Sequence, residues 1–249
     1  MAIYEKPVKL LFKDMVKELG VKKGDIIQRE QFFSWFKEKY PKIKEGTISA
    51  HILRLSINAP SRVHYNVHQK GDDDLLFQID SKRFRLFSPS SDSEPIYKKE
   101  PTDRDDTGEI EKPDDLPEVS EFAYEKDLQN FLSKNLHQIE SGLKLYEEED
   151  ITGIEFPAGN RYIDILALDK SNNYVIIELK VSRGYDRVVG QVLRYVAWIK
   201  KNHADEGQLV RGVIVAREIT EDLLLACSQI PNIDLYEYQL SVSLKRIED

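Results

Sequence analysis

The stretch over residues 88–120 constrains the fold most, because it divides the chain into two parts. It holds five prolines among serine, aspartate and glutamate, and its apolar residues show almost no periodicity. Such a segment cannot bury enough apolar surface to offset the entropy lost when it is ordered. We therefore expect an extended, mobile, acidic and proline-rich linker over 89–120, between one domain over 1–88 and a second domain over 121–249.

Charge is unevenly distributed over these parts. The net charge of the 249-residue chain is −8, but residues 1–90 carry +6, while residues 91–120 and 121–249 each carry −7. A basic N-terminal part and an acidic C-terminal part fit a DNA-contacting module joined to a carboxylate-rich one. The single cysteine excludes a disulfide framework and a cysteine-rich zinc site. The start lacks an apolar signal core and no apolar run could span a membrane, so we expect a cytoplasmic protein without a membrane partner.

The first part is predicted to begin with helices and to end with strands. Helical spacing of apolar residues favours three helices, and the pattern then changes to that of strands. The expected helices are 7–19, 29–40 and 47–55, and the expected strands are 62–65, 75–79 and 83–87. With a short extended piece after the first helix, this is the order of an α+β winged helix-turn-helix domain.

The third helix is the candidate DNA-reading element. Its apolar stripe leaves His51 and Arg54, with Asn58 one turn further on, on the opposite face. Arginine and asparagine can read guanine and adenine edges in the major groove, although an ordinary solvated polar face has the same pattern. Further cations flank the helix or lie in the expected wing, where phosphates would be contacted: Lys42, Lys44, Arg62, Lys82, Arg83 and Arg85.

After the linker, helical and strand patterns alternate. This favours an α/β domain with a mixed sheet and flanking helices. The expected helices are 121–136, 185–201 and 220–229, and the expected strands are 152–156, 162–168, 174–180, 210–216, 233–238 and 242–246.

Two of these apolar strands are interrupted by charged residues. Asp164 interrupts one, and Glu178 and Lys180 interrupt the next, where the period of two places them on one face. Buried charges are costly unless they pair or bind a metal. Two carboxylates can hold Mg²⁺ for phosphodiester hydrolysis, and the lysine can orient or deprotonate a water molecule. A structural salt bridge between the strands is the alternative.

Polar residues on two helices favour the catalytic interpretation. Glu125 lies in line with apolar positions of the first helix of this half, so its carboxylate is expected on the core side. Gln191 and Tyr195 are i and i+4 on the long helix, and packing gives no reason for a glutamine there.

These motifs together resemble those of the PD-(D/E)XK nuclease superfamily and, more narrowly, of the NucS endonuclease domain. The resemblance covers about residues 121–240 and implies a restriction-endonuclease-like core. It implies Glu125, Asp164 and Glu178 as the metal-site carboxylates, for Mg²⁺ or for Mn²⁺ in its place. It further implies Lys180 as the catalytic lysine, with Gln191 and Tyr195 as active-site supports.

The chain departs from this family in two respects. Ile163 replaces the proline that gives the superfamily its name, and the expected winged helix replaces the β-rich N-terminal domain of NucS proteins. We therefore expect a Mg²⁺-dependent DNA endonuclease of the restriction, defence or repair type, with the winged helix choosing the site and a homodimer as one route to double-strand cleavage. The alternatives are an inactive DNA-binding regulator, or a nuclease of RNA or of branched or mismatched DNA.

Overall fold

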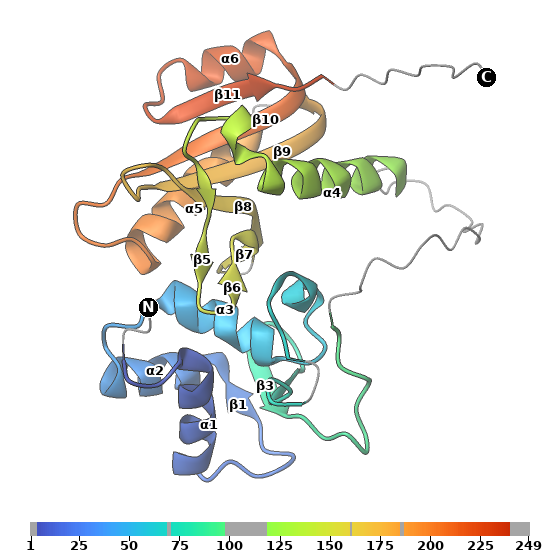
Figure 1. Ribbon diagram of the computed structural model, residues 1–249, viewed down its shortest axis with the longest axis vertical. Coiled ribbons are helices and arrows are strands. Elements are labelled where there is room, and N and C mark those ends of the chain that lie inside the picture. Colours follow the sequence, from blue (N-terminus) through green and yellow to red (C-terminus); the bar gives the residue numbers. More distant parts are fainter. Residues whose placement is uncertain (1–3, 69–70, 98–118, 160, 185–186, 240–249) are drawn as a thin grey trace, which may run out of the picture.

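The computed structural model describes residues 4–68, 71–97, 119–159, 161–184 and 187–239 and places the two parts of the chain one above the other (Figure 1). The first part is built from α1 (Val8–Glu18), β1 (Ile27–Gln28), α2 (Arg29–Lys39), α3 (Glu45–Leu55), a 3-10 helix (Pro60–His64), β2 (Leu76–Gln78) and β3 (Arg83–Leu86).

The element order of this N-terminal half is the one expected for a winged helix-turn-helix domain. Its small sheet has the strand order β1-β3-β2, and both pairings are antiparallel. One element differs from the prediction, because Pro60–His64 is a 3-10 helix where a strand was expected. Pro60 stands at the start of that helix, where its fixed φ favours a helical turn.

Aromatic residues form the core of the N-terminal half. Phe12 of α1 packs on Phe36 and Phe32 of α2, with ring centroids 4.8 Å and 5.6 Å apart, and Phe32 lies 5.7 Å from Phe84 of β3. All four rings are fully buried. One apolar cluster therefore holds α1, α2 and β3 together.

The C-terminal half is an α/β domain, as the sequence predicts. Its main elements are α4 (Val119–Lys134), β4 (Lys144–Leu145), β5 (Glu147–Glu148), β6 (Ile151–Thr152), β7 (Ile154–Ala158), β8 (Arg161–Leu168), β9 (Tyr174–Gly184), α5 (Arg187–Asn202), β10 (Val210–Ile219), α6 (Glu221–Cys227) and β11 (Ile233–Glu237). The strand expected over 242–246 lies outside the described residues.

The large sheet of this half is mixed. Its strand order is β11-β10-β9-β8-β4, and β7 pairs with the same edge of β8 as β4 does. The β9–β10 and β10–β11 pairings are parallel, whereas β8 is antiparallel to β9.

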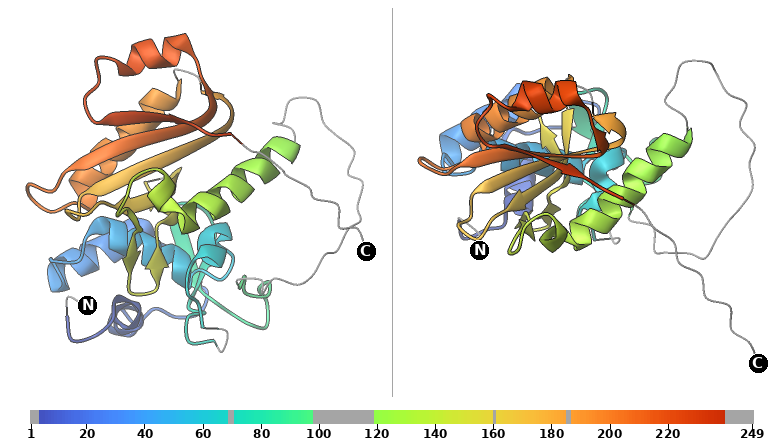
Figure 2. Two further views of the ribbon diagram at one scale, coloured as in Figure 1. Left: turned by 45° about the horizontal axis from the view of Figure 1, so that its top comes forward. Right: turned by 90° about the horizontal axis from the view of Figure 1, so that it is seen from above.

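Helices cover both faces of this sheet (Figure 2). Leu128 and Leu132 of α4 pack on the face that carries Ile165 and Ile177. Val192 of α5 packs with α6 on the opposite face. The predicted mixed sheet with flanking helices is confirmed.

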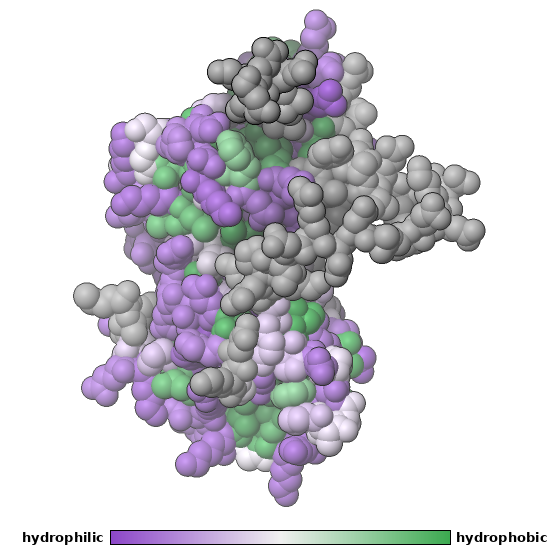
Figure 3. Space-filling view, turned by 45° about the vertical axis from the view of Figure 1, so that its right-hand side comes forward, coloured by the Kyte–Doolittle hydropathy of each residue, from purple (hydrophilic) through white to green (hydrophobic). Residues whose placement is uncertain are grey.

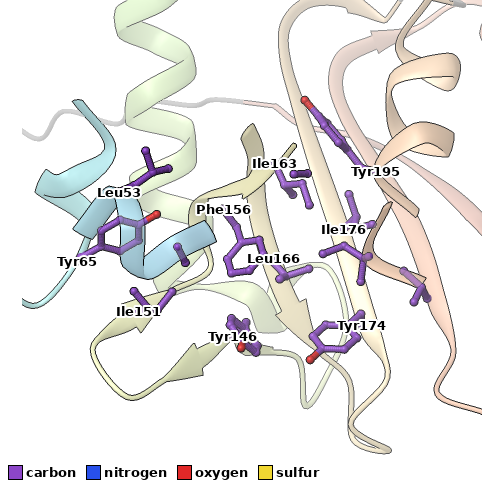
Figure 4. Packing of buried hydrophobic residues seen from close by; sticks show 14 of the residues in the cluster. Leu53, Tyr65, Tyr146, Ile151, Phe156, Ile163, Leu166, Tyr174, Ile176 and Tyr195 are labelled. Atoms are coloured by element: carbon purple, nitrogen blue, oxygen red, sulfur yellow. The ribbon is translucent and has the colours of Figure 1, made fainter. Parts of the chain in front are cut away.

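The two halves share a hydrophobic core. Leu53 of α3 and Tyr65 lie in one buried cluster with Ile151 of β6, Phe156 of β7 and Leu166 of β8 (Figure 4). The short β5–β6 hairpin inserts beside α3 and forms part of this contact. The N-terminal half is therefore docked on the nuclease-like half.

Part of the predicted linker packs on the N-terminal half. The Ile96 amide donates to the Ile57 carbonyl at 2.8 Å, and the Tyr97 hydroxyl donates to Asp74 at 2.6 Å. Residues 98–118, the rest of the predicted mobile segment before α4, lie outside the described residues.

Hydrophilic residues cover most of the coloured surface in Figure 3, with small separate hydrophobic areas between them. Among the described helices, none is both long and apolar enough to cross a membrane.

Candidate active site

The candidate site lies where β8 and β9 separate. Their antiparallel pairing is recorded as far as Ile165↔Ile177, and Asp164 and Glu178 are the next residues on the two strands. The Leu179 amide donates to Asp164 Oδ2 at 2.8 Å. Gln129 of α4 donates its side-chain amide to the Asp164 carbonyl at 2.8 Å, which satisfies a backbone group at the end of the ladder. The two carboxylate-bearing positions are thereby held side by side.

Glu178 is buried with one oxygen unpaired. Its exposed fraction is 1%, and Lys180 Nζ donates to Oε1 at 2.8 Å. Oε2 is also buried and has no hydrogen-bond partner within the described part of the chain. Lys180 Nζ donates further to the Leu179 carbonyl at 2.8 Å and lies 3.8 Å from Glu125 Oε1. Two carboxylates therefore pair with one ammonium group, and Asp164 adds a third negative charge nearby.

Burial and this excess of negative charge alter the titration of the site. Burial, and then the nearby Glu178, raise the pKa of Asp164 well above its usual value. Burial also raises the pKa of Glu178, against the opposing effect of Lys180. For Lys180, burial lowers the pKa, but Glu178 and Asp164 outweigh that effect and raise it. A bound cation would relieve the repulsion between the carboxylates.

The residues fit a divalent cation held by few protein ligands. Within the described ranges no three histidine, cysteine or acidic side chains form a preformed metal cluster. Mg²⁺ usually keeps several waters and uses one or two carboxylates, so Asp164 and the unpaired oxygen of Glu178 suffice. Glu125 contacts Lys180.

Gln191 and Tyr195 support the site from α5. The Gln191 amide donates to the Tyr195 hydroxyl at 3.3 Å, and that hydroxyl donates to the Tyr162 carbonyl at 2.7 Å. Tyr195 is 2% exposed. It thus fixes α5 to β8 two residues before Asp164.

A basic pocket adjoins the site. It measures about 590 Å³ and is lined by Arg161, Lys180, Arg187, Val188, Gly190, Gln191 and Arg194. In the sequence, Arg194 is marked only by its place between Gln191 and Tyr195, and no separate pattern marks Arg161 or Arg187. Sequence reasoning also missed Gln129. The net charge of the whole half conceals this local positive group.

The predicted DNA-reading face of α3 is wrong. His51 and Arg54 are fully buried, and so is Arg62 of the following 3-10 helix. In the structure α3 faces the C-terminal half, because the tip of the β5–β6 hairpin brings Glu149 and Asp150 against it. These side chains are therefore shielded from solvent and cannot contact DNA in this arrangement.

Each buried basic side chain of this junction has an acidic neighbour. Arg54 donates to Asp73 at 3.0 Å and 2.8 Å and to Asp150 at 3.0 Å. His51 Nε2 lies 3.4 Å from Glu149 Oε2, and Arg62 pairs with Asp74.

Most of the other predicted DNA contacts also have protein partners. Asn58 exchanges two hydrogen bonds with the backbone of Gln78 and so links α3 to the wing. The remaining cations split into two groups. Lys44, Arg83 and Arg85 pair with Asp205, Asp80 and Asp92, respectively. Lys42 and Lys82 are exposed, and their role in binding DNA stays a prediction.

Two family models match the chain. Residues 124–230 match the Endonuclease NucS C-terminal domain, and residues 7–86 match a Domain of unknown function (DUF7669). The first match confirms the predicted resemblance of the C-terminal half to NucS-type nucleases of the PD-(D/E)XK superfamily.

Curated relatives match the same half. Endonuclease NucS of Pyrococcus abyssi is 31% identical over 109 residues, 43% of this chain and 39% of the relative. Endonuclease NucS of Methanocaldococcus jannaschii is 32% identical over 107 residues, 43% of this chain and 38% of the relative. The chain thus aligns with less than two fifths of the relatives' length.

Two solved structures are also similar. A repair endonuclease from Pyrococcus abyssi has 23% identity and a TM-score of 0.38, and the match covers 66% of this chain and 61% of the chain in that structure. An EndoMS–dsDNA complex has 22% identity and a TM-score of 0.39, and the match covers 53% of this chain and 51% of the chain in that structure. Backbone overlap at these scores is partial, so the relationship rests on the family model and the sequence relatives.

Proposed function

We propose that this protein is a metal-dependent endonuclease that hydrolyses phosphodiester bonds of DNA with its C-terminal half. The observation that carries the proposal is the buried, unpaired Oε2 of Glu178, which lies beside Asp164 where β8 and β9 separate. A buried carboxylate oxygen without a partner is costly unless a ligand satisfies it. A divalent cation is the ligand that this donor set fits.

Each residue has a proposed task. Asp164 and Glu178 would hold Mg²⁺, or Mn²⁺ in its place, which stabilises phosphate charge and acidifies a water molecule when bound. Lys180, already bonded to Glu178, would donate to the attacking water or to a phosphate oxygen. Glu125 would hold Lys180 in place, and Gln191 and Tyr195 would keep α5 in register with β8.

DNA is the proposed substrate because the sequence relatives are NucS endonucleases and a similar structure is described as an EndoMS–dsDNA complex. The N-terminal half matches a different family model, so the choice between repair and restriction or defence substrates is part of the test. Site choice would not use α3, which is buried against the nuclease half. Double-strand cleavage would require two such sites, for which a homodimer is the simplest arrangement.

The test is cleavage of a substrate panel by the full-length protein. Intact plasmid, methylated plasmid, mismatched duplex, flapped duplex, single-stranded DNA and RNA are incubated with Mg²⁺, with Mn²⁺ or with EDTA. Glu178→Gln, which keeps the shape of the side chain and removes its charge, is the matched control. We expect metal-dependent cleavage of at least one DNA substrate by the wild type only.

Two other results would change the proposal. Binding without cleavage of any substrate would support the regulator alternative. Cleavage of RNA alone would keep the enzyme but change its substrate.

A further inference from the structure

Unneutralised arginines line the pocket beside the candidate active site. Five arginines elsewhere in the described chain pair with carboxylates: Arg54, Arg62, Arg83, Arg85 and Arg211. By contrast, Arg161, Arg187 and Arg194 have no carboxylate partner among the residues that the structure describes, and all three are exposed. Positive charge that has no carboxylate partner within the described residues, gathered in one hollow, indicates an anionic ligand.

The pocket also surrounds the first turn of α5. Arg187 is the first residue of that helix, so the positive end of the helix dipole adds to the arginine charges. The helix and the side chains therefore favour an anion at the same place.

Gly190 gives an independent reason to expect a ligand. It lies inside α5 and lines the pocket, although glycine destabilises a helix interior relative to alanine. A Cβ atom added at Gly190 would meet nothing within 4 Å among the described residues, so their packing does not require glycine. Close approach of a ligand to the helix backbone would require it.

We propose, on the basis of the function proposed above, that this pocket is a subsite for the sugar–phosphate backbone of DNA. It would hold phosphates next to the one that is cut, because Lys180 both lines the pocket and bonds to Glu178. The described lining contains no aromatic ring for base stacking. Recognition is therefore by charge, independent of base sequence and strongly dependent on salt.

The experiment measures binding without cleavage. Full-length Glu178→Gln protein is titrated into two fluorescein-labelled duplexes of unrelated sequence, and anisotropy is followed across a NaCl series. Arg161→Gln, Arg187→Gln and Arg194→Gln are added singly to this background. Lys200→Gln is the matched control, because it removes one exposed positive charge from the other end of α5.

Each pocket variant should weaken binding about tenfold for both duplexes, as expected when one charged hydrogen bond is lost. The slope of log affinity against log salt should fall by about one unit, and the control should bind as the parent does. Gly190→Ala should raise the melting temperature yet weaken binding, whereas a purely structural glycine would change stability alone.

The two proposals can fail separately. If the pocket variants lose affinity but the wild type cuts no substrate, the subsite stands and the nuclease proposal fails. If the wild type cuts DNA and the three arginine variants bind and cut like Lys200→Gln, the subsite proposal is overturned.

Discussion

The protein buries charge in two regions, and the two regions are balanced differently. At the junction of the halves, Arg54, Arg62 and His51 each have an acidic neighbour. In the candidate site, Glu178 and Glu125 both pair with Lys180, and Asp164 adds a further negative charge nearby.

This difference separates structural from functional buried charge. A buried ion pair with complementary partners can be explained by folding alone. An excess of one sign raises the free energy of the unliganded fold and so indicates a ligand. Both regions show charged residues inside apolar sequence, but only the balance of their partners distinguishes them.

The largest effect is expected for Glu178→Gln. Cleavage should fall about 1,000-fold or more, which corresponds to the loss of one principal electrostatic contact in the transition state. Arg54→Met, at the other buried cluster, should leave the rate per folded molecule near that of the wild type. Single-turnover cleavage of the best substrate measures both. An equal loss of cleavage rate in the two variants would contradict the proposed difference between the candidate site and the junction.

The same Glu178 variant tests the raised pKa. A carboxyl group whose pKa is raised in the fold contributes stability below its unfolded pKa and loses it as the pH rises through the folded value. In EDTA, wild-type stability should therefore decline as the pH rises above the usual glutamate range, and Glu178→Gln should decline less. Urea unfolding at several pH values measures this.

Arg54→Met should destabilise the fold by about 3 kcal/mol, because Asp73 and Asp150 would be left without their buried partner. The free energy of urea unfolding measures this loss. Lys42→Met, which removes an exposed charge from the same half, is the control and should unfold like the wild type. A DNA-reading role for Arg54 would instead predict altered sequence preference with unchanged stability.

Mg²⁺ should stabilise the protein only through the candidate site at Asp164 and Glu178. At a concentration 100 times its Kd, one bound ion should add about 2.7 kcal/mol to the free energy of unfolding. Arg54→Met should retain this increment, although its free energy of unfolding without metal is lower. Glu178→Gln should lose the increment. Urea unfolding with Mg²⁺ and with EDTA gives the increment. An equal increment in all three proteins would place the ion elsewhere.

The smallest effect is expected at a balanced pair nearer the surface. The Arg85 hydrogen bond lowers the pKa of Asp92 from its usual 3.8 to about 2. Because the folded pKa is lowered, the stability that it contributes is present above pH 4 and disappears as the pH falls through about 2. Asp92→Asn should cost about 1 kcal/mol at neutral pH and clearly less at pH 2, where about half of the folded molecules carry a protonated Asp92, as measured by urea unfolding. If the two proteins differ in free energy of unfolding by the same amount at both pH values, the effect comes from packing and not from the charge of Asp92.

The sequence by itself indicated the order of most helices and strands, apart from the 3-10 helix Pro60–His64 and the β5–β6 hairpin, and it picked out residues that the structure brings together in the candidate site. Alternating apolar residues made Asp164, Glu178 and Lys180 visible as interruptions, because a local period shows which side chains share a strand face. The same local rule found Gln191 and Tyr195 on one helix face. The family match to residues 124–230 confirmed the resemblance that these residues carry.

Only the tertiary structure decided which faces meet. The period of α3 showed that His51 and Arg54 lie opposite its apolar stripe, but helical periodicity cannot tell solvent from the surface of another domain. The β5–β6 hairpin, about 100 residues away in sequence, supplies the carboxylates that bury them. Likewise Arg161 and Arg194 become one pocket only when β8 and α5 pack together, since charge clustering in space depends on contacts between distant segments that no local pattern encodes.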